Sequence, residues 1–229
     1  MSKVPVITID GLSGAGKGTV SKMLCNELGW NILDSGALYR TLIFLMERKR
    51  IDIKEFESMK KEILKDFQVS FGLNSLEEPV NVFLKNKDIT SLIRTEEIAE
   101  KTSTLSSLKE IRDFIKPCQR AFKQLPGLVA DGRDMGTVIF PEADLKIFLT
   151  ATLKERVKRR ETQLKRQGSR VNMRFLLDEL EARDKKDIER ELSPLKPADD
   201  SIVVDTTGIS PKEVLTEIKK LLFNLKIMN

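Results

Sequence analysis

The apolar residues of this chain fall into five short runs, separated by longer segments whose apolar positions recur with helical spacing. Runs of this length, bounded by polar residues, are typical of buried strands. They lie at residues 4–9, 31–33, 128–130, 145–149 and 202–204. Helices are expected at residues 17–28, 37–48, 108–124, 153–167, 174–191 and 211–225. This alternation predicts an α/β fold: a five-stranded parallel sheet flanked by helices on both faces.

A different pattern appears between residues 50 and 95. In residues 67–71, phenylalanine and valine alternate with glutamine and serine, as in a half-exposed strand. Residues 80–84 repeat the alternation, and Asn86-Lys87 is expected to turn the chain into a short third strand. The pattern therefore predicts a small antiparallel subdomain inserted into the parallel fold.

A glycine-rich segment joins the first predicted strand to the first predicted helix. Glycines in this context allow successive backbone N–H groups to turn inward around a polyphosphate, and the helix N-terminus adds partial positive charge. The lysine at its end can reach the β- and γ-phosphates. The segment predicts a phosphate-binding loop made of Gly11, Leu12, Ser13, Gly14, Ala15, Gly16, Lys17, Gly18 and Thr19.

The loop departs from the common pattern at one position, because Lys17 is followed by Gly18 instead of a serine or threonine. A hydroxyl at that position usually binds Mg²⁺ directly. We therefore expect Mg²⁺ to arrive with ATP and to be held by phosphate oxygens and water, with Thr19 nearby, and we predict no metal site built from protein side chains. Asp131, at the end of the third strand, either orients metal-bound water or merely caps the strand end.

Two further segments combine arginine with polar residues where a strand ends. Ser35 can cap the second predicted helix and, with Arg40, grip a second phosphate, although a plain capped helix with a surface arginine fits as well. Arg133 follows the third strand, at the carboxyl edge where ligands bind in open α/β sheets, and suits bidentate contact with phosphate. Its neighbour Asp134 can accept a hydrogen bond from an exocyclic amine such as N4 of cytosine.

The helix predicted at residues 174–191 places Arg183 and Asp187 on one face, with Arg190 one turn further on. Taken alone, this segment would also fit a charged helix face that is exposed to solvent and binds nothing.

These blocks together resemble the bacterial cytidylate kinases, which are nucleoside monophosphate kinases. The matching residues are 7–19 (ITIDGLSGAGKGT), 33–40 (LDSGALYR), 119–149 and 182–195, and the motif ADGRDMGTVIFP is highly specific. The resemblance implies a P-loop nucleoside monophosphate kinase fold with an inserted antiparallel subdomain and a helical lid. Its expected division is a core of residues 1–40, 96–152 and 171–229, a nucleoside-monophosphate-binding insert of residues 41–95, and a lid of residues 153–170.

The same resemblance implies transfer of the γ-phosphoryl group of ATP to CMP or dCMP. The glycine-rich loop would bind ATP. The residues implied for CMP are Ser103, Arg112 and Asp134 at cytosine, Arg183 and Asp187 at the sugar, and Ser35, Arg40, Arg133 and Arg190 at the phosphate. Ser103 lies within TSTLSS, so a neighbouring hydroxyl could take its place. Lys17 and Arg133 are the catalytic residues expected outside the lid.

The expected lid carries many more basic than acidic residues. Such a segment also fits a nucleic-acid-binding helix, but no aromatic residues interleave for base stacking. A basic flap over transferring phosphates fits the neighbouring loops better. Arg156 and Arg160 are the favoured clamps on the transferring phosphoryl group, and Arg159 stays open as an alternative. The basic residues are Lys154, Arg156, Lys158, Arg159, Arg160, Lys165, Arg166 and Arg170.

The amino-acid composition excludes some classes of enzyme, because the chain of 229 residues contains no histidine. Imidazole-based hydrolases and histidine-ligated metal enzymes are thereby excluded. Transfer between phosphates tolerates this lack, since a monophosphate with a second pKa near 6 is largely dianionic at neutral pH and needs no general base. The formal net charge of +5 favours anionic ligands without choosing among them.

We expect a soluble, cytoplasmic monomer whose partners are small molecules, without nucleic acid or membrane. Three other functions stay open. One is a related kinase acting on UMP or AMP. Another is a kinase with a hydroxyl acceptor, in which Asp131 or Asp134 would be the general base. The last is an ATPase or switch protein that depends on nucleic acid.

Overall fold

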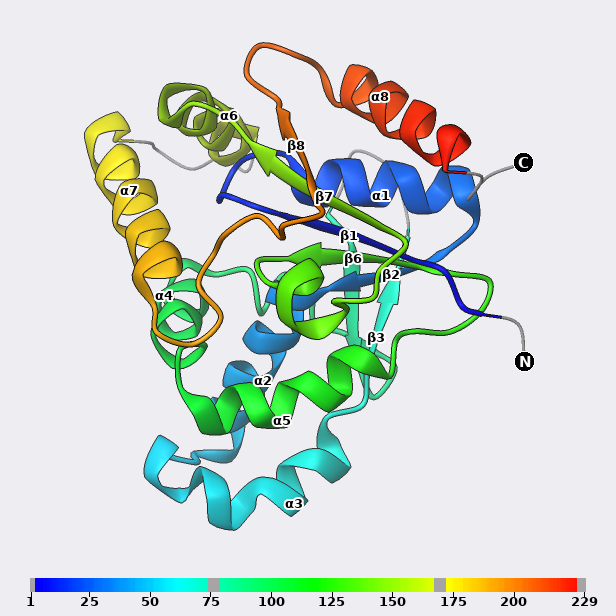
Figure 1. Ribbon diagram of the computed structural model, residues 1–229. Coiled ribbons are helices and arrows are strands. Elements are labelled where there is room, and N and C mark those ends of the chain that lie inside the picture. Colours follow the sequence, from blue (N-terminus) through cyan, green and yellow to red (C-terminus); the bar gives the residue numbers. More distant parts are fainter. Residues whose placement is uncertain (1–2, 74–78, 167–171, 226–229) are drawn as a thin grey trace.

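The computed structural model describes residues 3–73, 79–166 and 172–225, and it is built around a parallel sheet with the strand order β2-β6-β1-β7-β8 (Figure 1). The five predicted strands and their parallel arrangement are confirmed. The first strand begins two residues later than predicted and the third runs two residues further. The strands are β1 (Val6–Gly11), β2 (Asn31–Asp34), β6 (Leu128–Gly132), β7 (Leu145–Thr150) and β8 (Ile202–Asp205).

Helices cover both faces of this sheet, with α1 (Lys17–Leu28) and α8 (Pro211–Asn224) on one face and α2 (Ser35–Lys49) and α5 (Lys109–Arg120) on the other (Figure 1). The alternation of side chains along β1 separates the two faces: Ile7 packs with α1 and α8, whereas Val6 packs with α2 and α5. Within the described residues, no helix is both long and apolar enough to cross a membrane.

The helix ends follow local capping chemistry. Gly29, at φ 65°, ends α1 in the left-handed conformation that glycine tolerates. Ser210 caps α8 in a capping box with Glu213, and a proline opens that helix as predicted. The helices α6 (Leu153–Arg166) and α7 (Met173–Glu189) lie beside each other, close to their predicted positions. The predicted end of the first of them, Gln167, lies outside the described residues.

Several short helices were not predicted, of which α3 (Phe56–Asp66) and α4 (Glu96–Leu105) are the longest. The signal for α3 was present, because Phe56, Ile63 and Phe67 are buried along one side of it. Thr95 accepts the N–H of Ile98 and so begins α4. The remaining two are the 3₁₀ turn η1 (Ile53–Glu55) and the π-helical turn η2 (Met135–Ile139).

The inserted antiparallel sheet is confirmed, with the order β3 (Val69–Gly72), β4 (Asn81–Leu84) and β5 (Lys87–Asp88). Two details of its prediction were wrong. Phe67 does not start the first strand, because its N–H bonds to Ile63 at the end of α3. The hairpin turn uses Lys85 and Asn86, whose φ values of 49° and 62° suit a tight turn between antiparallel strands, and the next residue already pairs.

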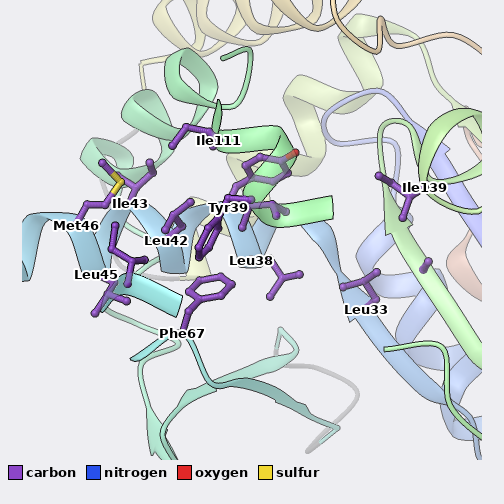
Figure 2. Close-up of a cluster of buried hydrophobic side chains, with 14 of the residues drawn as sticks. Leu33, Leu38, Tyr39, Leu42, Ile43, Leu45, Met46, Phe67, Ile111 and Ile139 are labelled. Atoms are coloured by element: carbon purple, nitrogen blue, oxygen red, sulfur yellow. The ribbon is translucent and has the colours of Figure 1, made fainter. Parts of the chain in front are cut away.

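The largest apolar cluster lies under α2 and joins it to β2, α3, α5 and η2 (Figure 2). Leu38 and Leu42 on α2 are fully buried in it, with Phe67 from the end of α3 and Ile111 from α5 nearby. This packing fixes the helix that carries Ser35 and Arg40 at the edge of the parallel sheet.

Replacing Leu42 by alanine should lower the free energy of unfolding by about 2–5 kcal/mol, because it removes buried methyl groups and leaves a cavity. Leu42 is 0% exposed, whereas Leu64 on α3 is 55% exposed and offers the matched control. Leu64→Ala should change stability by less than about 1 kcal/mol. Urea unfolding followed by circular dichroism measures both, and equal losses would contradict the central place of Leu42.

Candidate active site

The carboxyl ends of the central strands meet at one edge of the sheet, as the sequence predicts. Asp131 on β6 lies between Ile9 on β1 and Asp34 on β2 in the strand register. The loops that follow these strands therefore start side by side, at the place where ligands bind in open α/β sheets.

Gly11 is the point at which the chain leaves β1 for the phosphate loop. Its φ is 146°, and a Cβ atom there would lie 2.0 Å from the carbonyl oxygen of Leu149 on the adjacent β7. Any other residue would force the two strands apart. The close approach directs the loop over the sheet edge.

The loop closes on itself and ends at an open helix N-terminus. The N–H of Ala15 donates to the carbonyl of Leu12 at 3.3 Å, and Nζ of Lys17 donates to the same carbonyl at 2.9 Å. α1 begins at Lys17, and no side chain caps its first turn. An uncapped N-terminus under a lysine is a ready site for an anion such as a polyphosphate.

Burial acts on both charges beside this loop. It lowers the pKa of Lys17, and the neighbouring Arg133 lowers it further. Burial likewise raises the pKa of Asp131, against the opposing effect of Lys17. An anionic ligand at the loop would favour the charged form of the lysine.

The carboxylate of Asp131 lies against the start of α1, with Oδ2 3.4 Å from where a Cβ atom on Gly18 would stand. Among the described residues, no group of three or more acidic or cysteine side chains could hold a metal ion. A magnesium ion here would therefore take most of its ligands from phosphate oxygens and water. Asp131 is an oxygen donor of the kind that Mg²⁺ accepts, so the residues present fit such an ion.

Arg133, Asp187 and Arg190 come together from the loop after β6 and from the C-terminal end of α7. Nε of Arg133 donates to Oδ2 of Asp187 at 2.8 Å, and Nη1 of Arg190 lies 3.9 Å from the other carboxylate oxygen. Burial would raise the pKa of Asp187, but the charges of Arg133, Arg190 and Arg183 outweigh it and hold that pKa below its usual range. Nη2 of Arg190 is buried and has no hydrogen-bond partner among the described residues. The cluster therefore offers unused guanidinium donors to an anion.

Arg112 and Asp134 form a nearly buried ion pair through Nη2 and Oδ2. Nη1 of Arg112 also donates to the carbonyl of Ser106 at 3.1 Å. Arg112 and Tyr39 line a cavity of about 140 Å³ together with Ile139 and Ser193. The structure thus places an acceptor and a donor next to each other, and the donor Arg112 lines a small cavity.

Ser103 is half-buried on α4, in the segment TSTLSS. Three of its neighbours, Thr102, Thr104 and Ser107, donate their hydroxyls to helix carbonyls. Each of these three hydroxyl groups therefore already donates a hydrogen bond to a backbone carbonyl. Ser106 reaches Arg112 through its carbonyl oxygen.

One local prediction at Ser35 was wrong. Asp34 caps α2, because its Oδ1 accepts the N–H of Ala37 at 2.9 Å, and Ser35 is already the first helical residue. The extended backbone of Asp34 at the end of β2 suits the cap position. The buried hydroxyl of Ser35 instead accepts a hydrogen bond from Gln119 at 2.8 Å.

Arg40 lies among other arginines on the same side of the site. Its Nη1 donates to the carbonyl of Ile93 at 3.2 Å. Burial lowers its pKa to about 10, and the nearby charges of Arg183 and Arg94 act in the same direction. Arg94, which sequence reasoning missed, contacts Asp34 at 3.4 Å. Guanidinium groups gathered this way are suited to an anion that offsets their repulsion.

The three arginines of α6 that were expected to act as clamps have different surroundings. Arg156 is buried; its Nε donates to Ala151 at 3.0 Å, and its Nη1 donates to the carbonyl of Ser13 at 3.0 Å and to Asp184 at 2.5 Å. Arg159 donates to Thr206, whose hydroxyl in turn donates to the carbonyl of Ala15. Arg160 pairs with Glu96 at the start of α4. Arg170 lies outside the described residues.

Besides Arg94, sequence reasoning missed Asp10, Asp184 and Thr206. Asp184 lies three residues before Asp187 on α7, so helical spacing alone would have placed both on one face. Thr206 follows β8 and gave no comparable signal. Asp10 immediately precedes the phosphate loop and accepts the N–H groups of Met135 and Gly136.

The family model described as cytidylate kinase matches residues 7–224 of this chain. A cytidylate kinase from Stutzerimonas stutzeri (strain A1501) is 47% identical over 215 residues, covering 94% of this chain and 93% of that protein. One from Pseudomonas syringae pv. tomato is 48% identical over 216 residues, covering 94% of each. A solved structure of an uncharacterized protein from Eubacterium ventriosum has a TM-score of 0.50 at 14% identity over 97% of this chain and 99% of that one, a likeness of fold alone.

Binding of a nucleoside triphosphate to the phosphate loop should take up protons. Burial lowers the pKa of Lys17 in the free protein, and the phosphates raise it again, so the protonated fraction of the lysine increases on binding. Calorimetric titration with metal-free ATP at pH 8, in two buffers of different ionisation enthalpy, measures the uptake. We expect a net uptake of up to about one proton per site.

Two variants identify the side chain that takes up this proton. Lys17→Met should abolish the uptake, whereas Asp131→Asn should retain it, because the lysine is the group that becomes charged. Binding to the wild type without proton uptake would contradict the lowered pKa of Lys17.

Proposed function

The chain belongs to the cytidylate kinase family and is therefore a kinase, and from this membership we propose that it transfers the γ-phosphoryl group of ATP to CMP or dCMP at the edge of the parallel sheet. One observation supports placing the reaction at this edge. The Arg112–Asp134 pair and the cluster of Arg133, Asp187 and Arg190 lie at the same sheet edge as the phosphate loop. The two substrates can therefore meet there.

ATP binds with its phosphates around the glycine-rich loop. Successive backbone N–H groups and the open N-terminus of α1 face the phosphates, and Lys17 exchanges its contact with Leu12 for phosphate oxygens. When bound with ATP, Mg²⁺ would neutralise part of the charge of the phosphates. Asp131 is the side chain that would hold the ion, through water, with Thr19 nearby.

The phosphate of CMP binds to Arg40, Arg133 and Arg190, with Ser35 as a further donor. Asp187 holds Nε of Arg133, and Nη1 donates to the carbonyl of Gly132 at 3.3 Å, which leaves Nη2 available for the phosphate. The hydroxyl of Ser35 accepts from Gln119 and keeps its own hydrogen for donation. Arg183 and Asp187 contact the sugar.

Cytosine is read by Asp134 and Arg112, with Ser103 as a third contact. The edge of cytosine presents the N4 amine as donor beside the N3 acceptor, which matches a carboxylate beside a guanidinium. Uracil presents the opposite order at these atoms, an acceptor at O4 and a donor at N3. This pairing therefore favours CMP and dCMP over UMP.

The reaction needs no general base, because the attacking phosphate is already an anion at neutral pH. Catalysis consists of aligning the two phosphates and compensating their charge with Lys17, Arg133, Arg156 and Arg160. Arg156 is supported by its position against Ser13 of the loop. Arg160 would reach the phosphoryl group by giving up Glu96, and Arg159 stays an alternative.

The proposed division of the chain into a core, an insert and a lid follows these contacts. The core comprises residues 1–40, 96–152 and 171–229, residues 41–95 form the monophosphate-binding insert, and residues 153–170 form the lid. The small antiparallel sheet and α6 support the insert and the lid, respectively, while α2 runs across the boundary at residue 40. We also propose a cytoplasmic protein that needs no nucleic acid or membrane, and a monomer, since all proposed site contacts come from one chain.

An ADP-release assay with a panel of acceptors tests the proposed function. CMP and dCMP should be phosphorylated well, with UMP and AMP poorer by at least about tenfold in kcat/KM, since each unmatched hydrogen-bonding group costs about 1–3 kcal/mol. A clear preference for AMP would refute the cytosine assignment. ADP release that depends on added DNA or RNA, without CDP, would instead identify a nucleic-acid-dependent ATPase.

Two substitutions separate base recognition from chemistry. Asp134→Ala should raise KM for CMP by about tenfold or more, because it removes a base contact and leaves Arg112 without its buried partner. Lys17→Ala should chiefly lower kcat. Glu217→Gln, on the exposed side of α8, is the charge-loss control and should change neither. Unchanged CMP kinetics in Asp134→Ala would disprove its contact with the base.

A further inference from the structure

Asp10 is a buried carboxylate at the penultimate position of β1, only 5% exposed. Its Oδ1 accepts the backbone N–H of Met135 at 2.8 Å, and its Oδ2 accepts that of Gly136, also at 2.8 Å. Both carboxylate oxygens are thus used by consecutive residues of one loop. That loop carries Arg133 and Asp134 immediately before them.

The loop is pressed closely against β1 at this contact. A Cβ atom on Gly136 would lie 2.9 Å from Oγ1 of Thr8 and 3.2 Å from Cδ of Lys146. Gly136 therefore lets the backbone approach the strand closely enough for both N–H groups to reach Asp10. Met135 is fully buried beneath the turn, so the loop is held from both sides.

Only a group with two acceptor oxygens can satisfy this pair of N–H groups. Aspartate meets the requirement, whereas asparagine would turn its amide NH₂ toward one of the donors. Burial raises the pKa of Asp10 to about 6 despite these hydrogen bonds, so the ionised carboxylate prevails at neutral pH. The charge-assisted bonds therefore hold the loop under working conditions.

We propose that Asp10 is a positioning residue for phosphoryl transfer, which fixes the loop bearing Arg133 and Asp134 relative to the phosphate loop. The phosphate loop begins at Gly11, the next residue, so one carboxylate sets the spacing between donor and acceptor sites. The proposal rests on the proposed function, because it assigns Asp10 to the acceptor loop of that site. Small displacements of reacting groups are costly, so the effect should appear in turnover as well as in CMP binding.

The test compares Asp10→Asn with Thr8→Val in steady-state kinetics with CMP and ATP. Asp10→Asn should raise KM for CMP and lower kcat, each by about tenfold or more, while KM for ATP stays within about twofold. Thr8 is the matched control, because it lies on the same face of β1 and its buried hydroxyl has no hydrogen-bond partner among the described residues. Thr8→Val should leave all three constants within about twofold of the wild type.

Amide hydrogen exchange distinguishes positioning from general destabilisation. In Asp10→Asn, exchange should accelerate at Met135 and Gly136 while the amides of β1 and β7 stay protected. Loss of protection across the sheet, with ATP and CMP affected alike, would overturn the proposal in favour of a purely structural role. Unchanged KM for CMP and unchanged kcat would overturn it as well.

If Asp10→Asn does not fold, Gly136→Ala is the second variant, because its Cβ atom would displace the same loop from the opposite side. It should likewise raise KM for CMP and lower kcat, while KM for ATP stays within about twofold. Unchanged CMP kinetics in that variant would overturn the proposal. Wild-type protein that fails to phosphorylate CMP refutes the proposed function instead. An active wild type with kinetically normal Asp10→Asn refutes the role of Asp10 alone.

Discussion

Holding positive charge out of water, in a fixed place, is the constraint on which this site depends. Three buried or nearly buried arginines are each held by an aspartate, in the pairs Arg112–Asp134, Arg133–Asp187 and Arg156–Asp184. Removing one partner of such a pair typically costs about 3–5 kcal/mol, because the other charge is left uncompensated. The pairs thus orient the guanidinium groups in the free protein, which would lower the cost of arranging them in the proposed reaction.

The fold brings these partners together from distant parts of the chain. Asp184 and Asp187 lie on one face of α7, so this single helix binds both α6 and the loop after β6. β1, at the centre of the sheet, supplies the phosphate loop and, through Asp10, fixes the loop after β6. The proposed donor and acceptor sites are therefore attached to one strand and one helix, while α6 contributes Arg156 against the phosphate loop.

Local patterns predicted much of the fold, and the phosphate loop followed from glycine spacing after an apolar strand. Errors arose where two local signals competed, as when Phe67 closed the last turn of a helix instead of starting a strand, and when Asp34 took the cap expected of the adjacent Ser35. The ion pairs were beyond prediction from local pattern, because Arg156 and Asp184 are 28 residues apart and belong to different helices. A sequence indicates which residues carry charge, whereas the pairing of Arg156 with Asp184 depends on how α7 packs against α6.

The most direct test of this account is a crystal structure of the protein with CMP and a non-hydrolysable ATP analogue. The account predicts the CMP phosphate in hydrogen-bond contact with Arg133, with the bond between Nε and Asp187 retained. It further predicts the cytosine edge against Asp134 and Arg112, and the triphosphate around Lys17. CMP bound away from Arg133, or cytosine without contact to Asp134, would contradict the central claim that the paired arginines form the acceptor site.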